Sequence, residues 1–139
     1  MTSENRARRT AVLSERESAR LLKTRDVGRL ALVVDGRPEI FPVNYAFDER
    51  AVVFRTSPGM KLERGPYTAA AFEVDHVDRT SKVAWSVVVH GTAHDITGSA
   101  DRLSERLRTL VVRPAVPGQR RRWMAIYADR ITGRRFRLG

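Results

Sequence analysis

Alternating apolar and polar positions along most of the chain predict a protein built mainly of β-strands. The strongest runs, rich in β-branched and aromatic residues, cover 28–34, 38–47, 51–56, 69–74, 82–96 and 123–128. Within 38–47 the side chains divide into an apolar set (Phe41, Val43, Tyr45, Phe47) and a smaller, more polar set (Pro42, Asn44, Ala46). Because successive side chains of a strand point to opposite faces, we expect an aromatic core face and an open second face.

Turn signals between these runs indicate antiparallel neighbours. The dipeptide Asp35-Gly36 ends the first run and predicts a tight hairpin to the second. Gly91 interrupts the long run 82–96, where it predicts a bulge or a bend. The charged segment 75–80 is expected to connect that long run to the run before it.

Two main helices are expected beside the strands. Ser14 and Glu17 form a capping box ahead of a helix of about three turns, and residues 1–12 before it are expected to be a flexible arm. Residues 99–110 place leucines at helical spacing, with Ser99 as the expected N-cap. About six strands with two helices and no internal repeat predict a mainly β fold, a small antiparallel barrel with flanking helices.

The length and composition predict one domain, residues 13–139, that binds no metal. A chain of this length is too small for separate cofactor and substrate domains, so we expect an active site to borrow walls from a second copy. No apolar run approaches the roughly 20 residues that span a bilayer, and the N-terminus lacks an apolar signal core. We therefore expect a cytoplasmic protein without a membrane partner. The chain has no cysteine, and its three histidines lack metal-ligand spacing.

The net charge of +10 raises the alternative of a nucleic-acid partner. Much of the charge is concentrated in residues 118–139, which hold seven arginines and one aspartate. Elsewhere both signs are interleaved, as on solvated helix faces. No helix-turn-helix, zinc finger or aromatic nucleotide platform is readable, so nucleic acid is not the expected partner. An anionic small ligand accounts for part of the same bias.

The segment 54–62 has the residue types of a phosphate-binding turn. Arg55 and Lys61 supply positive charge and several N–H donors, Thr56 and Ser57 supply hydroxyls, and Gly59 allows close approach of the backbone. In an ideal strand Arg55 and Thr56 point to opposite faces, so both can serve one anion only through strand twist or at the end of the ladder. A surface ion pair is the alternative role for Arg55.

The order of these motifs resembles the pyridoxamine 5′-phosphate oxidase-like family of flavin-binding split β-barrels, in particular small actinobacterial-type and nitroimidazole-resistance-like members. The resemblance covers roughly residues 12–137 and is carried by the segments 27–30, 42–45, 53–56, 71–75, 85–91 and 130–135, together with Pro38, Gly59, Lys61 and Leu62. It implies a six-stranded antiparallel split barrel that forms a homodimer with two flavin sites at the interface.

The resemblance also implies roles for individual residues. Pro42, Val43 and Asn44 would line the isoalloxazine ring, and Arg55, Thr56 and Lys61 would hold the phosphate and ribityl chain. Trp85 and Ser86 would close the site, although a core tryptophan beside a satisfied serine is an equal alternative. Met60 stands where related oxidases usually carry an arginine, which removes one donor.

The function implied is an FMN-dependent oxidoreductase acting on a small molecule, in which the cofactor performs the hydride or electron transfer. No side chain is assigned as catalytic. A second hypothesis replaces FMN with a deazaflavin, whose acidic tail could use the arginine-rich C-terminus. A third is a non-enzymatic flavin carrier or a nucleic-acid-binding protein.

Overall fold

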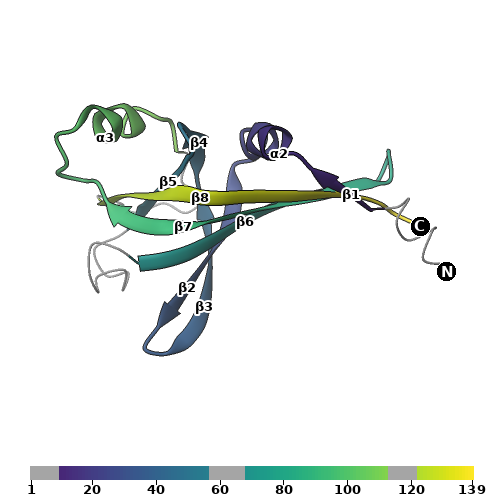
Figure 1. Ribbon diagram of the computed structural model, residues 1–139, viewed down its shortest axis with the longest axis horizontal. Helices are drawn as coiled ribbons and strands as arrows, with labels where there is room; N and C mark the ends of the chain where they lie inside the picture. Colours follow the sequence, from purple (N-terminus) through teal and green to yellow (C-terminus); the bar gives the residue numbers. More distant parts are fainter. Residues whose placement is uncertain (1–9, 57–67, 113–121) are drawn as a thin grey trace.

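Strands dominate the computed structural model, which describes residues 10–56, 68–112 and 122–139. Seven strands form one antiparallel sheet in the order β3 (Arg37–Asn44), β2 (Val27–Val34), β6 (Thr68–Asp78), β7 (Val83–Asp95), β8 (Arg122–Arg137), β5 (Ala51–Thr56) and β4 (Ala46–Asp48). An eighth strand, β1 (Thr10–Leu13), pairs with β8. In Figure 1 the long strands β6, β7 and β8 form an extended layer, from which the β2–β3 hairpin projects.

The sheet curls because its two edge strands are consecutive in the chain. The strand order begins with β3 and ends with β4, and only Tyr45 separates these two strands in sequence. The edges must therefore approach each other, and β3 does contact β5 across the gap. Counted as one interrupted strand, β3 and β4 join β2, β5, β6, β7 and β8 in a six-stranded split barrel, with β1 as an addition. The predicted fold is confirmed, although the sheet as a whole has eight strands.

Two apolar clusters lie on opposite faces of the curled sheet. The larger one fills the barrel, and its fully buried members include Leu30, Phe54, Phe72, Val87 and Ile126. The predicted core face of residues 41–47 is confirmed, since Val43, Tyr45 and Phe47 are buried there and Phe41 packs against them. The smaller cluster consists of Ala51, Val53, Ile96, Leu107 and Ala125. Strand β5 contributes to both clusters because its side chains alternate.

Both helices lie on the same side of the long strands in Figure 1. Helix α2 (Glu15–Leu22) begins as predicted, with the Ser14 hydroxyl accepting a hydrogen bond from the Glu17 N–H at 3.1 Å. Helix α3 (Arg102–Leu107) is shorter than the predicted 99–110, and its N-cap is Asp101 rather than Ser99. The Asp101 carboxylate accepts from the Ser104 N–H at 3.0 Å and so takes over the capping role.

The two predicted turn features are confirmed. Asp35 and Gly36 have φ angles of 52° and 76°, as a tight hairpin turn between β2 and β3 requires. The pairing of β7 with β8 shifts register between His90 and Gly91, which is the bulge expected at the glycine. A Cβ on Gly91 would lie 1.9 Å from the Tyr127 carbonyl oxygen, so no larger residue fits at this position.

Three predicted boundaries are wrong because strand pairing extends beyond the runs that the sequence pattern marks. Strand β6 continues through 75–78, where its backbone pairs with β7 up to the match of Asp78 with Val83. Strand β8 continues from 128 to Arg137, so the arginine-rich C-terminus is a paired strand. The expected arm 1–12 is wrong for residues 10–12, which belong to β1, whereas residues 1–9 lie outside the described part. In each case the backbone groups of a neighbouring strand are available for hydrogen bonds, whatever the side chains of the segment are.

No helix among the described residues is long and apolar enough to cross a membrane.

Candidate functional site

The last two residues of β5 carry buried polar atoms without partners. Thr56 is 2% exposed, and its hydroxyl oxygen makes no hydrogen bond. The Nε atom of the neighbouring Arg55 is also buried and has no hydrogen-bond partner. Buried polar atoms are nearly always satisfied in folded proteins, so two adjacent exceptions at the end of a strand mark a candidate ligand site. Both residues belong to the predicted phosphate-binding turn.

Arg55 and Thr56 face different sides of β5, as their adjacent positions predict. Thr56 follows the alternation of Val52 and Phe54, which point into the barrel, whereas Arg55 follows Val53 of the smaller cluster. The Arg55 guanidinium lies over the Trp123 ring, 4.7 Å from its centroid. The two side chains can therefore contact one ligand only if that ligand lies at the end of β5, where it can reach both faces of the strand.

The second predicted group, on β3, lies beside this strand end. Ala46 of β4 pairs with Val53 of β5. Because β3 directly precedes β4 in the chain and runs antiparallel to β5, the last residues of β3 lie beside the last residues of β5, and the two strands are in contact. Val43 is buried in the core, Asn44 is half-buried and Pro42 is exposed. The fold therefore brings the Pro42-Val43-Asn44 segment and the Arg55-Thr56 pair to one end of the barrel.

The third predicted group, Trp85 and Ser86, lies elsewhere in the same chain. Trp85 opposes Arg135 on β8, whereas Arg55 opposes Trp123, so twelve residues of β8 separate the two positions. That separation corresponds to on the order of 40 Å of strand path. Trp85 is 8% exposed and belongs to the main core cluster, and Ser86 is half-buried. Their predicted role at a cofactor stays a prediction, and within one chain they do not adjoin Arg55.

The remaining residues of the predicted turn, Lys61 with Ser57, Gly59 and Met60, lie outside the described residues, as does the expected helical stretch 60–63.

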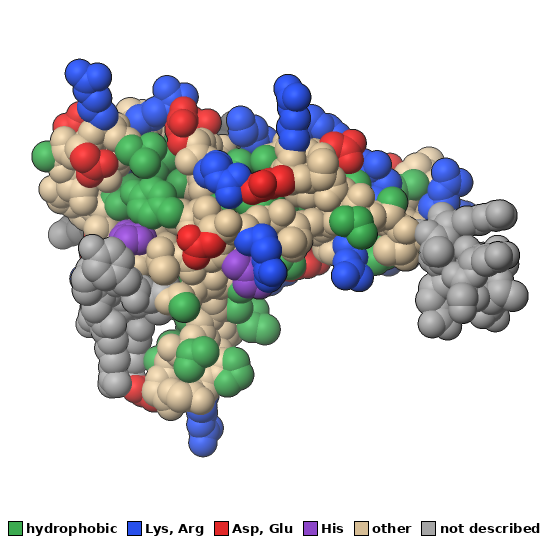
Figure 2. All heavy atoms as spheres, viewed as in Figure 1, with side chains coloured by type: hydrophobic (Ala, Val, Ile, Leu, Met, Phe, Trp, Pro, Cys, Tyr) green, Lys and Arg blue, Asp and Glu red, His purple; other side chains and the backbone are tan. Residues whose placement is uncertain are grey.

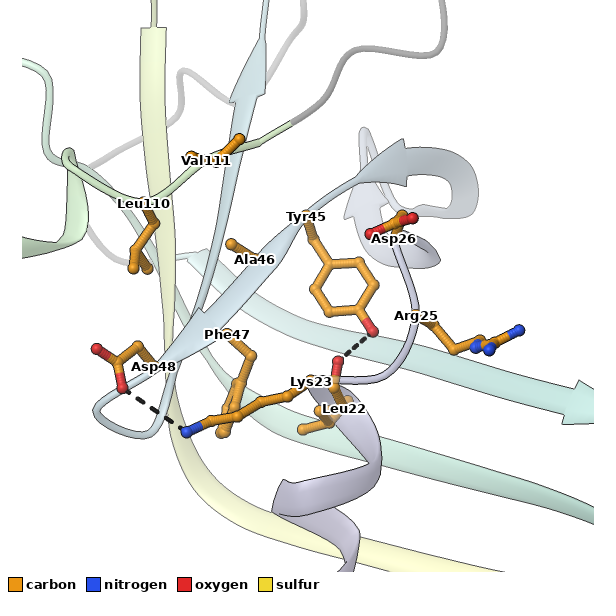
Figure 3. A pocket seen from close by; sticks show the side chains of 10 residues that line it. All are labelled: Leu22, Lys23, Arg25, Asp26, Tyr45, Ala46, Phe47, Asp48, Leu110 and Val111. Atoms are coloured by element: carbon orange, nitrogen blue, oxygen red, sulfur yellow. Dashed lines mark hydrogen bonds and ion pairs between the residues drawn. The ribbon is translucent and has the colours of Figure 1, made fainter.

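A pocket of about 310 Å³ opens beside the junction of β3 and β4 (Figure 3). Its walls combine apolar and charged side chains: Leu22, Lys23, Arg25, Asp26, Tyr45, Ala46, Phe47, Asp48, Leu110 and Val111. Lys23 and Asp48 form an ion pair of 3.9 Å at its edge. Burial raises the pKa of Tyr45, whose hydroxyl donates a hydrogen bond to the Leu22 carbonyl and so remains protonated. The sequence does not predict this pocket, because its walls come from three segments that are far apart in the chain.

A compact acidic cluster lies on the outer face of β6, where β2 pairs with it. Arg29 Nη1 lies 3.5 Å from carboxylate oxygens of both Glu73 and Asp75. Burial, together with the hydrogen bond and the negative charge of Asp75, raises the pKa of Glu73 to about 7, although Arg29 opposes the shift. Glu73 is therefore a group that titrates near neutral pH.

The histidines do not share a site. His76 Nδ1 accepts a hydrogen bond from the Arg25 guanidinium at 3.1 Å, and the His94 ring meets Tyr127 edge-on. His90 is half-buried, and its Nδ1 atom has no partner. Across residues 10–56, 68–112 and 122–139, no group of three or more histidine, aspartate or glutamate side chains could hold a metal ion.

Positive charge is dispersed over the face shown in Figure 2, where Lys and Arg side chains alternate with Asp and Glu along the molecule. Several cations are paired with acids, including Arg106 with Asp48 at 3.0 Å and Arg122 with Asp95 at 3.3 Å. This face offers no continuous basic track of the kind that follows a nucleic-acid backbone.

The curled sheet with unpartnered donors at one end defines the chain as a split β-barrel with a candidate ligand site at the strand ends. Residues 14–135 match the family described as Pyridoxamine 5′-phosphate oxidase, and the chain belongs to this family. The resemblance seen in the sequence motifs is thereby confirmed.

Individual proteins are similar to this chain in sequence or in structure. The chain is 32% identical over 101 residues to an uncharacterized protein from Mycobacterium tuberculosis; the match covers 68% of this chain and 66% of that curated relative. The FAD binding protein from Mycobacterium smegmatis has a similar structure, with a TM-score of 0.75 and 32% identity over 91% of this chain and 98% of that one. A FAD-binding protein from Mesorhizobium loti shares the fold at a TM-score of 0.70 and 24% identity, covering 91% and 97% of the two chains.

Trp123 is the contact that sequence reasoning missed at this site. The run 123–128 was expected to be a strand, but nothing in the sequence pairs its first residue with Arg55. Only the register of β5 against β8 brings the two side chains together.

Proposed function

We propose that this protein is a flavin-dependent oxidoreductase that holds FMN at the end of β5 and acts on a small molecule. The observation that carries the proposal is the pair of buried, unpartnered polar atoms on Arg55 and Thr56. A phosphate group with several acceptor oxygens would satisfy both, because charge-assisted hydrogen bonds are strong where water is excluded. The family and the flavin-binding relatives support the same cofactor class.

Each predicted residue has a stated task in this proposal. Thr56, Arg55 and Lys61 bind the phosphate and ribityl chain, and Pro42, Val43 and Asn44 line the ring. When bound, the flavin supplies the hydride or electron transfer. The Asn44 side chain would contact the ring, and backbone N–H groups near Val43 and Asn44 would stabilise negative charge on the ring when it is reduced. We expect Asn44→Ala to shift the reduction potential of the bound flavin, and an unchanged potential would remove Asn44 from the ring site.

Completion of the site requires a second copy of the chain. Trp85 of β7 pairs with β8 twelve residues away from the β8 position that pairs with Arg55, and Ser86 lies next to it, so they can close the site only from a partner in a homodimer. An exposed apolar surface on the β2–β3 hairpin supports such a partner, since Val33 and Ile40 are 67% and 68% exposed. Light scattering should therefore give twice the mass of the 15.7 kDa chain. A monomer that still binds flavin tightly would contradict the interface site.

FAD and a deazaflavin are the alternative cofactors. The relative from Mycobacterium smegmatis is named for binding FAD. A deazaflavin with an acidic tail would be favoured by the exposed arginines on β8, among them Arg130, Arg134 and Arg137. A flavin carrier without enzymatic activity would use the same residues and lack turnover.

The deciding experiment identifies the small molecule that co-purifies with the protein, by absorption spectrum and mass. Titration of the ligand-free protein with FMN, FAD and a deazaflavin then ranks the three cofactors by affinity. Tight FMN binding supports the proposal. If the protein prefers a deazaflavin, the proposed oxidoreductase function stands and the cofactor is a deazaflavin instead of FMN. Failure of all three to bind, with DNA binding that weakens steeply as salt rises, would overturn it.

A further inference from the structure

We infer that Trp123 is a positioning residue for the ligand phosphate, because its indole holds the Arg55 guanidinium in place. This inference rests on the proposed flavin site. Arg55 and Trp123 are direct partners in the pairing of β5 with β8, and the guanidinium lies 4.7 Å from the centre of the ring. A cation at this distance over an indole face is attracted by the electron-rich ring.

Trp123 is itself firmly placed by the structure around it. The backbone N–H of Trp123 donates to the Thr97 hydroxyl at 2.9 Å, and its backbone carbonyl accepts from the Ile96 N–H at 2.9 Å. The side chain packs against the smaller cluster (Ala51, Val53, Ile96, Leu107 and Ala125). The backbone contacts fix this part of β8, and packing against the cluster restricts the indole, whereas arginine has more rotamer freedom to lose.

Stacking leaves the hydrogen-bonding edge of the guanidinium available. The five N–H donors of arginine lie in its plane, whereas the aromatic contact uses the face of that plane. The Nε donor is already buried and has no hydrogen-bond partner. A phosphate oxygen reaching this edge would gain a desolvated, pre-oriented donor, and less side-chain entropy would be lost on binding. The ligand class is thus a phosphate monoester or a pyrophosphate carried by the flavin.

A matched control is available on the same strand. Tyr127 lies on the same face of β8 as Trp123 and also packs against the smaller cluster, but its ring contacts His94 rather than Arg55. Removing the Tyr127 ring disturbs the same packing without touching the guanidinium. A purely structural role for Trp123 would give the same binding result at both positions.

The test measures the affinities of FMN, riboflavin and inorganic pyrophosphate by calorimetry for the full chain and its Trp123→Leu, Trp123→Phe and Tyr127→Leu variants. Riboflavin is the control ligand because it has the ring and ribityl chain but no phosphate. We expect Trp123→Leu to weaken FMN and pyrophosphate roughly tenfold and riboflavin less than twofold. Trp123→Phe should retain most of the affinity, and Tyr127→Leu should leave the ratio of riboflavin to FMN affinity unchanged.

The outcomes separate this inference from the proposed function. If wild type and Trp123→Leu bind flavins with the same ratio of riboflavin affinity to FMN affinity, the positioning role alone is overturned. Pyrophosphate binding that depends on Trp123, without any flavin binding, would retain the role and overturn the proposed flavin function. Absence of binding by all three ligands would overturn both. If Trp123→Leu fails to fold, Trp123→Met takes its place as the variant without an aromatic face: loss of the phosphate preference in Trp123→Met supports the role, and an unchanged preference opposes it.

Discussion

The Tyr45 hydroxyl donates a hydrogen bond of 2.5 Å to the Leu22 carbonyl, which joins the end of α2 to the junction between β3 and β4. Tyr45 is 4% exposed and also meets the Phe72 ring edge-on at 5.0 Å. Carbonyls in the last turn of a helix lack partners within that helix. The Tyr45 hydroxyl supplies such a partner for the Leu22 carbonyl. The same hydrogen bond anchors Tyr45, the single residue between β3 and β4.

Tyr45→Phe should lower the free energy of unfolding by about 1 to 2 kcal/mol. The ring and its contact with Phe72 remain, but the Leu22 carbonyl loses its partner where water has little access. Chemical denaturation with an unchanged m-value would measure the loss. A variant as stable as wild type would mean that water replaces the hydroxyl at this carbonyl.

Gly91→Ala should be among the most damaging small substitutions in the chain. The added methyl would lie 1.9 Å from a backbone oxygen of Tyr127, and backbone cannot move aside as a side chain can. We expect a loss of about 3 kcal/mol or more, seen as a large drop in Tm. Gly98→Ala is the matched control, because nothing lies within 4 Å of a Cβ there and its φ is not positive. Equal stability of the two variants would show that the bulge can rearrange.

Local signals in the sequence were sufficient for most of the fold. The Asp35-Gly36 turn, the Ser14 cap and the alternation in residues 41–47 each depend on neighbouring residues alone, and each was predicted correctly. Strand ends were predicted poorly. Whether residues 75–78 or 129–137 continue a strand depends on the presence of a neighbouring strand, which composition does not reveal.

At the candidate site, too, some features follow from local sequence and others from strand pairing. The residue types that suit a phosphate, Arg55 and Thr56, were recognisable from the sequence. Their lack of partners, the contact with Trp123 and the distance to Trp85 all follow from strand register. Register is a property of the assembled sheet, because a shift of one residue reverses every side chain.

Stability should fall as pH rises through the range set by Glu73. Its pKa is raised from 4.5 to about 7, chiefly by burial, so the folded protein keeps a proton that the unfolded chain releases. The stabilising contribution of Glu73 to the free energy of unfolding is complete below about pH 4.5 and is lost as the pH rises through about 7. Because the carboxylate is a third exposed, we expect an amplitude of only about 1 kcal/mol.

Glu73→Gln should remove this pH dependence and raise the Tm above pH 7. Asp75→Asn is a second check, because loss of its negative charge should lower the pKa of Glu73 and move the transition to lower pH. Unfolding curves from pH 4 to 8 would show either result. A slope that survives Glu73→Gln would assign the titration to another group.

Thr56→Val should stabilise the ligand-free protein while weakening phosphate binding. Valine has nearly the same shape and suits a strand, and it removes a buried hydroxyl that has no partner. We expect a gain of about 1 kcal/mol in the free energy of unfolding, measured by denaturation without ligand. Function at this position therefore opposes stability, as is usual where a protein keeps a polar group ready for a ligand.

Ser18→Ala provides the opposite case for Thr56. Ser18 is fully buried, and its hydroxyl donates to the Ser14 carbonyl at 2.8 Å, so its removal should destabilise the protein by about 1 kcal/mol. The two substitutions each delete one buried hydroxyl and should change the Tm in opposite directions. If Thr56→Val also lowers the Tm of the ligand-free protein, its hydroxyl is bonded in solution, and the donor pair at the end of β5 is not held open for a phosphate.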